Sequence, residues 1–283
     1  MFGATKTSCS LWLLLICLTA QPTLSRHRRK LHLRAEPDSS IGDVVAPRNL
    51  SPFQVSIQNV HQKHKCSGAI LSKDWIVTTA HCMKRANVST YRIVTGTQTL
   101  GATDARIGVY KIEYVIPHPH FDKPKKSNDI ALIRTHRSIE FNSLVKEIKC
   151  LGSPLPRDSL VMHTGWSWRK GVAEKEMRGV YHRVIPYALC LSYFESRVRN
   201  PIGPGHMCLN LPRDKDYCLR ETGGLLVHKT KLAGLSSFGA PCASGEPFIA
   251  TRISFYYDFI RTIMRGCVRC TQEFGFQARF FDL

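Results

Sequence analysis

The amino-acid sequence predicts an all-β protein, either a sandwich or a barrel. From about Pro52 onward, short runs of β-branched and aromatic residues alternate with glycine, proline, asparagine and aspartate, which is the pattern of short strands separated by turns. Helical spacing is convincing in one late segment only. With 283 residues, of which 43% are hydrophobic, the chain can bury a sizeable core as one large domain or two small ones.

The clearest strand candidates are five short apolar runs, at 53–57, 75–79, 92–95, 130–133 and 232–235. A helix is expected over 253–264, because apolar and aromatic residues recur there at helical spacing on one face, namely Ile253, Tyr256, Tyr257, Ile260 and Ile263. Residues 265–283 then form a C-terminal extension that contains Cys267 and Cys270.

Residues 1–25 are expected to be a cleaved secretory signal peptide. Lys6 precedes an apolar run over 11–20, which is too short for a stable membrane span. Small residues leave two cleavage positions open, after Ala20 or after Ser25. Because no later apolar run is long enough for a bilayer, we expect a secreted, extracellular protein without a transmembrane segment.

Residues 26–40 form a basic arm that is similar to a propeptide. Arg26 to Arg29 fit the R-x-[KR]-R pattern that furin-type convertases cleave, and a basic solvated arm explains these residues equally well. Two N-glycosylation sequons begin at Asn49 and Asn87, and secretion makes both of them credible. Pro52 directly follows the first sequon, which we expect to reduce its use.

The formal net charge is +19, and the body of the chain stays basic without its first 40 residues. In a secreted protein such a charge attracts polyanions, for example glycosaminoglycans of the heparan type, anionic membranes or acidic proteins. A solvated surface that only confers solubility explains the charge as well. Nucleic acid is not expected as a partner, because the chain has a signal and no recognisable nucleic-acid-binding module.

Eleven cysteines include Cys9 and Cys17 in the signal, which leaves nine in the secreted chain. Secretion makes disulfides the expected state, and an odd number leaves at least one thiol free or paired with another chain. Cys267 and Cys270 have the spacing of a redox or zinc site but lack a thioredoxin-like context and two further ligands. We therefore expect a structural or intermolecular disulfide there, no metal and no other cofactor.

Three motifs follow one another along the chain. T-T-A-H-C contains His81, N-D-I-A-L contains Asp129, and C-L-R-E-T-G-G-L-L contains Thr222. With T-G-W at 164–166 and S-F-G at 237–239, they resemble the histidine, aspartate and nucleophile motifs of the chymotrypsin/trypsin-like serine proteases. For residues 41–264 this resemblance implies two packed six-stranded antiparallel β-barrels with a C-terminal helix, His81 and Asp129 lying on the first barrel and Thr222 on the second.

The resemblance implies that the acid–base half of the site is intact and the nucleophile half is not. His81 and Asp129 match the family pattern, but Thr222 replaces the serine, and its extra methyl restricts χ1 and hinders attack on an acyl carbon. Arg220 stands in place of an oxyanion-loop glycine, and Glu221 in place of an aspartate. We expect an inactive homologue that binds a protein or a polyanion. The alternative is a weak or unusual endopeptidase that uses Thr222.

Asp216, at the position of the specificity pocket, has two interpretations. Asp216 matches the aspartate that selects Arg or Lys substrates in trypsin-like members, and an exposed loop carboxylate explains it too. Phe248 replaces a glycine of the pocket wall and Tyr217 replaces a small residue, so both are expected to fill the pocket. Activation is also expected to be impaired, because Ser40 precedes Ile41 where the family has a basic residue.

The resemblance further implies three disulfides, Cys66–Cys82, Cys190–Cys208 and Cys218–Cys242. Cys150 is similar to the cysteine that tethers a propeptide in two-chain members. Since no cysteine lies between Arg26 and Cys66, we expect Cys150 to pair with Cys267 or Cys270.

Overall fold

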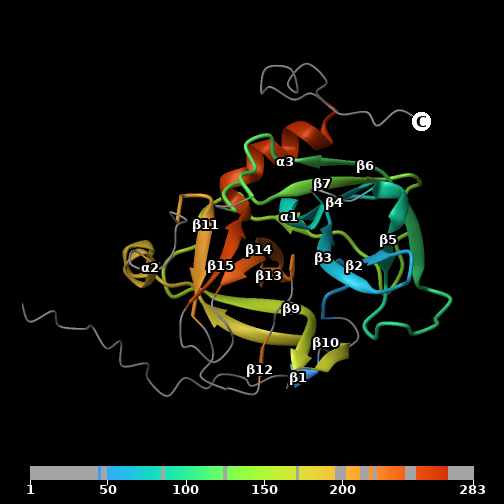
Figure 1. Ribbon diagram of the computed structural model, residues 1–283, viewed down its shortest axis with the longest axis horizontal. Coiled ribbons are helices and arrows are strands. Elements are labelled where there is room, and N and C mark those ends of the chain that lie inside the picture. Colours follow the sequence, from blue (N-terminus) through green and yellow to red (C-terminus); the bar gives the residue numbers. More distant parts are fainter. Residues whose placement is uncertain are drawn as a thin grey trace, which may run out of the picture. The chain divides into compact units, whose positions relative to one another are not determined.

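The computed structural model describes nine stretches of the chain: 44–45, 50–83, 87–123, 126–169, 172–194, 202–210, 217–218, 222–239 and 247–266. These stretches contain two β-sheets and a short C-terminal helix (Figure 1). The all-β class predicted from the sequence is therefore confirmed.

The first sheet is a closed six-stranded barrel in the order β2-β3-β4-β7-β6-β5. Its strands are β2 (Gln54–Asn59), β3 (His64–Ile70), β4 (Trp75–Thr78), β5 (Tyr91–Thr95), β6 (Gly108–Pro117) and β7 (Ala131–Thr135). Every neighbouring pair is antiparallel. Alternate residues such as Val55, Ile57 and Ile93 are fully buried in its core, as the period of two along a strand requires. The predicted first barrel is confirmed.

The second sheet has nine strands, and the path β1-β10-β9-β13-β14-β15-β11 carries side pairings of β12 with β9 and of β8 with β14. The strands are β1 (Val44–Val45), β8 (Lys149–Cys150), β9 (Leu160–Arg169), β10 (Val172–Arg183), β11 (His206–Leu209), β12 (Tyr217–Cys218), β13 (Leu225–His228), β14 (Lys231–Gly239) and β15 (Phe248–Arg252). The resemblance implied a second barrel of six strands. Three two-residue strands, β1, β8 and β12, raise the number to nine, and the path of paired strands among the described residues does not close into a barrel.

The predicted C-terminal helix is present over 253–264. It begins as the 3-10 turn η2 (Ile253–Tyr256) and continues as α3 (Tyr257–Met264). Ile260 and Ile263 are buried in a core cluster that also takes residues from both sheets, for example Leu132 on β7 and Leu235 on β14. The helix thus packs where the first barrel and the second sheet share a core.

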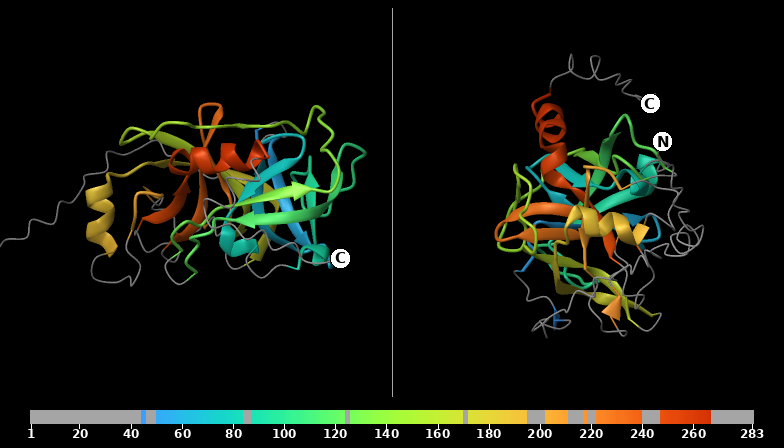
Figure 2. Two further views of the ribbon diagram at one scale, coloured as in Figure 1. Left: turned by 90° about the horizontal axis from the view of Figure 1, so that it is seen from above. Right: turned by 90° about the vertical axis from the view of Figure 1, so that its left-hand side faces the viewer.

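Three further short helices are α1 (Ala80–Met83), η1 (Val88–Thr90) and α2 (Tyr187–Phe194). Nothing in the sequence pattern predicts α2, because its apolar residues do not gather on one face: Cys190 is buried whereas Tyr187 and Tyr193 are exposed. Figures 1 and 2 show α2 beyond β11, on the side away from the first barrel. The Cys190–Cys208 disulfide, which the resemblance implied, joins α2 to β11.

Candidate active site

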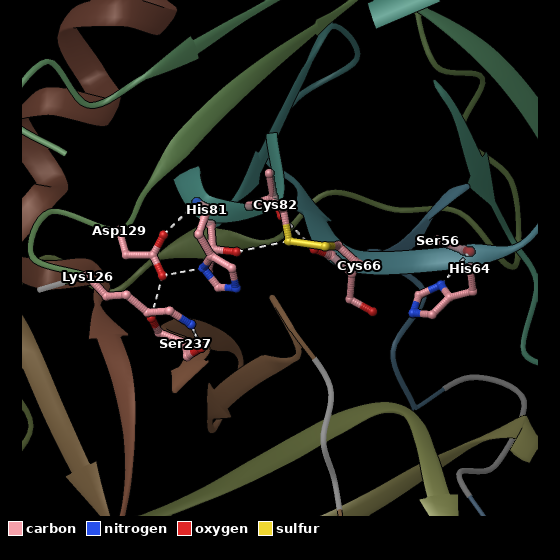
Figure 3. The surroundings of a disulfide bond; sticks show 11 residues. Ser56, His64, Cys66, His81, Cys82, Lys126, Asp129 and Ser237 are labelled. Atoms are coloured by element: carbon pink, nitrogen blue, oxygen red, sulfur yellow. Dashed lines mark hydrogen bonds and ion pairs between the residues drawn. A yellow bond between two sulfur atoms is a disulfide. The ribbon is translucent and has the colours of Figure 1, made fainter. Parts of the chain in front are cut away.

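His81 lies in α1, the single turn that follows β4. The implied Cys66–Cys82 disulfide is present and ties this turn to β3, with Cα atoms 6.4 Å apart (Figure 3). Ala80 and Met83 are buried on either side of the histidine and anchor the turn in the barrel. The imidazole is consequently held in one place while 17% of its side-chain surface stays exposed.

The Asp129 carboxylate accepts two hydrogen bonds from His81. The His81 backbone N–H donates to Oδ1 at 2.8 Å, and the ring Nδ1 donates to Oδ2 at 2.6 Å. Because an ionised carboxylate only accepts, the neutral ring carries its proton on Nδ1 and leaves a lone pair on Nε2. This is the orientation that a general base needs to take a proton from an alcohol.

Groups of the second sheet fix Asp129 in turn. The Ser237 hydroxyl on β14 donates to Asp129 Oδ2, and the Thr251 hydroxyl on β15 donates to the Asp129 backbone carbonyl at 2.7 Å. Tyr256 in η2 donates to the side chain of Asn128 at 3.2 Å. Asp129, just before β7 of the first barrel, is therefore held by β14 and β15 of the second sheet, and its neighbour Asn128 is held by η2. Sequence reasoning did not assign these three hydroxyls to the site, although S-F-G contains Ser237.

Thr222 lies in the turn before β13, and backbone contacts place it against β3. Its carbonyl accepts the Ser67 N–H at 2.8 Å, and the N–H of Gly223 donates to the Ser236 carbonyl at 2.9 Å. Gly223 has φ +74°, and a Cβ there would lie 2.3 Å from the Ser67 carbonyl oxygen, so this position requires glycine. Among the described residues, no hydrogen bond joins the Thr222 hydroxyl to His81.

The comparison with known proteins agrees with this arrangement, in which a histidine–aspartate pair lies at the contact of a six-stranded barrel and a second sheet. The sequence pattern of the family described as Trypsin matches residues 40–260. The chain belongs to the trypsin family. Rat trypsin-4 (Rattus norvegicus) is 25% identical over 234 residues, which are 81% of this chain and 91% of that protein.

Two other members of the trypsin family show comparable similarity. Vitellin-degrading protease of Bombyx mori is 30% identical over 238 residues, 80% of this chain and 88% of its own length. Human chymotrypsin-like elastase family member 1 is 28% identical over 242 residues, 79% of this chain and 92% of its own length. The trypsin-family match therefore covers both sheets and most of each relative.

Several expected site residues lie outside the described residues: Asp216, Arg220, Glu221, Cys242, Cys267, Cys270 and Asn49. The backbone of Tyr217 and Cys218 forms β12 and pairs with β9. The pocket role of Tyr217, the Cys218–Cys242 bridge and the oxyanion-loop roles stay predictions. Asn87 is exposed and caps η1 through its side-chain oxygen, and its glycosylation also stays a prediction.

Phe248 begins β15, and its ring packs against two histidines of the second sheet. It stacks on His163 of β9 at 5.4 Å between ring centroids and meets His182 of β10 edge-on at 4.9 Å. Both histidines are buried, and burial lowers the pKa of His182 to about 4 and that of His163 well below its usual value. Sequence reasoning missed this cluster, because a histidine within a strand run gives no sign of its neighbours.

Cys150 has no disulfide partner among the described residues. It lies on β8 against the core shared by the two sheets, and burial raises the pKa of its thiol to about 12. Its predicted partners lie beyond residue 266, so the pairing stays a prediction. None of the helices in the described stretches combines the length and the apolar character needed to span a membrane.

Proposed function

We propose that this chain is a secreted trypsin-family protein that does not cleave peptide bonds and acts by binding a protein or a polyanion. The observation that carries the proposal is a contrast within the site. His81 and Asp129 are joined by two short hydrogen bonds, whereas the Thr222 hydroxyl has no hydrogen bond to His81 in the described residues. The base is oriented by Asp129, and no hydrogen bond of the described residues couples it to the Thr222 hydroxyl.

The chemistry explains why this contrast matters. In acyl transfer the hydroxyl of residue 222 passes its proton to His81 Nε2 while its oxygen bonds to the substrate carbonyl carbon. The β-methyl of Thr222 restricts χ1, which hinders rotation of the oxygen toward that base. Arg220 also replaces a glycine of the oxyanion loop, and loss of one oxyanion donor typically lowers the rate about 100- to 1,000-fold.

A fluorophosphonate probe tests the proposal directly, because it labels only an activated hydroxyl. We expect no labelling of the wild type, and labelling of an Arg220→Gly/Thr222→Ser variant that His81→Ala abolishes. Peptide substrates of the Arg type and the Phe type, assayed with the same proteins, measure turnover. Labelling of the wild type that disappears in Thr222→Ala would overturn the proposal.

That last result would establish the alternative function, a weak endopeptidase with a threonine nucleophile. The intact His81–Asp129 pair is the observation that favours it. The Thr222→Ser single variant separates the two functions further. An inactive scaffold gains nothing or little from serine alone if Arg220 also blocks the site, whereas a threonine enzyme becomes faster because the methyl is removed.

Heparin chromatography separates the two kinds of partner. A net charge of +19 favours polyanion binding, which weakens steeply with salt because bound counterions are released. Retention well above physiological salt is expected for a polyanion-binding protein. Elution near physiological salt would exclude the polyanion and leave a protein partner.

A further inference from the structure

A row of three basic residues crosses the strands at one end of the second sheet. Lys149 of β8 is the direct neighbour of Lys231 at the start of β14, and His228 of β13 is paired with Lys231 on its other side. Directly opposite residues of paired strands point to the same face of a sheet, and adjacent strands lie about 4.8 Å apart. The three side chains therefore project from one face as a closely spaced basic row.

The two lysines of the basic row have no acidic partner in the part of the chain that the structure describes. No carboxylate there lies within ion-pair distance of Lys149 or Lys231, and both side chains are exposed. Several described arginines do have such partners, in the pairs Arg106–Asp104, Arg134–Glu113, Arg137–Glu140 and Arg261–Asp258. Like charges directly opposite each other destabilise a pair of strands. Within the described residues, the pairing of β8 with β14 therefore carries a repulsion that no carboxylate offsets.

Lys229 adds a further cation in the turn that joins β13 to β14. The turn consists of Lys229 and Thr230, and Lys229 has φ +55°. Glycine, asparagine and aspartate favour this left-handed conformation in two-residue turns, whereas other side chains are strained there. A lysine at this position costs stability, as does the repulsion between Lys149 and Lys231. Two independent features of one surface are thus unfavourable for folding, which is the pattern expected of a binding site.

We propose that Lys149, Lys229 and Lys231 form the binding site of a sulfated polysaccharide, which lies across the ends of β8, β14 and β13. Sulfates repeat along such a polymer, so successive anions meet successive ammonium groups, and each contact releases counterions. Binding also offsets the repulsion between Lys149 and Lys231. An acidic peptide fits less well, because peptides gain most of their affinity from apolar or aromatic anchors and this site supplies separate point charges. The inference rests on the proposed binding function and specifies its polyanion partner.

This lysine site is separate from the candidate active site along the same strand. Ser237, which donates to Asp129, lies near the opposite end of β14 from Lys231. Binding at the lysine site and labelling at residue 222 can therefore be measured independently.

Fluorescence anisotropy with a labelled heparin oligosaccharide, at several NaCl concentrations, tests the site on the full-length secreted protein. We expect Lys149→Gln/Lys229→Gln/Lys231→Gln to bind roughly tenfold or more weakly at physiological salt. The slope of log affinity against log salt should fall by roughly one for each lysine removed. The matched control removes as many charges from exposed positions elsewhere and should change the affinity less than about twofold; it is Lys63→Gln/Lys111→Gln/Lys175→Gln.

Lys231→Glu separates binding from folding. A negative charge next to Lys149 replaces repulsion with attraction, so this variant should unfold at a higher urea concentration than the wild type. It should nevertheless bind heparin more weakly. A loss of binding together with a gain of stability cannot come from misfolding.

Three results would overturn the assignment: equal losses in the two triple variants, unchanged heparin binding by Lys231→Glu, or tighter binding of polyglutamate than of a heparin oligosaccharide with as many charges. The proposed function fails separately. Fluorophosphonate labelling of the wild type would reject the lack of proteolysis and leave the lysine site standing. Elution of the wild type from heparin near physiological salt would reject the polyanion partner itself, whereas equal losses in the triple variants would reject only its location.

Discussion

Gly223 is the residue on which the position of Thr222 depends. Its φ of +74° turns the chain so that the carbonyl of Thr222 meets β3, and its missing side chain lets the Ser67 carbonyl approach. Any side chain at this position has to displace the backbone of β3. The nucleophile position is therefore set by the backbone and not by the side chain that occupies it.

Gly223→Ala should destabilise the fold by about 2–4 kcal/mol, because it combines a positive φ with a contact of 2.3 Å between the new Cβ and a backbone oxygen. Gly101→Ala is the control, since Gly101 has φ +83° but a methyl group added there would meet no atom within 4 Å. It should lose only about 1–2 kcal/mol from the backbone conformation. Urea unfolding measures both, and equal losses would show that the Ser67 contact does not matter.

His163 and His182 couple stability to pH. Burial lowers the pKa of His182 from 6.5 to about 4, so the folded state favours the neutral ring. Its contribution is complete above pH 6.5 and is lost as the pH falls toward 4, at up to about 1.4 kcal/mol per pH unit. His163 acts in the same direction, because burial and its neighbour His182 lower its pKa as well.

Replacing His182 with Gln should remove one group that binds a proton in the unfolded state but not in the folded state. Between pH 6.5 and pH 4, the free energy of unfolding of His182→Gln should fall less steeply than that of the wild type. Urea unfolding at several pH values checks this. His136→Gln, at an exposed position, should keep the wild-type slope. The same slope in wild type and His182→Gln would contradict the assignment.

Among the elements, strands were easier to predict than the contacts between them. The run predicted over 92–95 became β5 (Tyr91–Thr95), because alternating burial in a barrel follows the sequence pattern directly. α2 was missed because its apolar residues are spread around the helix: Cys190 and Phe194 are buried in a core cluster, whereas Tyr187 and Tyr193 are exposed. Of the site, His81 and Asp129 were predicted through their motifs. The contacts that Ser237 and Thr251 make with Asp129 were not, because they arise only when segments distant in sequence pack together.

β15 holds the loop that contains Asp129, and this contact is testable. Thr251→Val keeps the shape of the side chain but removes the hydroxyl that donates to the Asp129 carbonyl, in a site that is 1% exposed. We expect a loss of about 1–3 kcal/mol, because a buried carbonyl is left without its donor. Thermal or urea unfolding measures it. Thr90→Val, at a more exposed local contact, should change stability much less, and a similar loss there would argue against the role of β15.

At the scale of the whole chain, eleven cysteines are an odd number, and Cys150 bears on which distant segments are linked covalently. Cys150 lies on β8 beside the core cluster that also includes Met264 at the end of α3, and the predicted partners, Cys267 and Cys270, follow α3 closely. Disulfide formation there would close a loop of more than 100 residues and restrict the unfolded chain.

Non-reducing peptide mapping should find the Cys150 peptide linked to the peptide that carries Cys267 or Cys270. Alkylation in urea without reductant is the second measurement. In the folded protein a free Cys150 would react slowly, because burial raises its pKa to about 12, but unfolding would expose it. A Cys150 that becomes alkylated in urea alone would show that it is a free thiol.

The hydroxyls that bind Asp129 give this residue a structural role in addition to any role in acid–base chemistry. Since Ser237 and Thr251 reach it from the second sheet while His81 reaches it from the first barrel, the aspartate fastens the halves of the fold to each other. A substitution at residue 222 that abolished catalysis would leave this structural role of Asp129 unchanged. A hydrogen-bonded histidine–aspartate pair then reports that the two parts of the fold are packed together. Counting every such pair as evidence of a protease would overestimate the number of chains that cleave proteins.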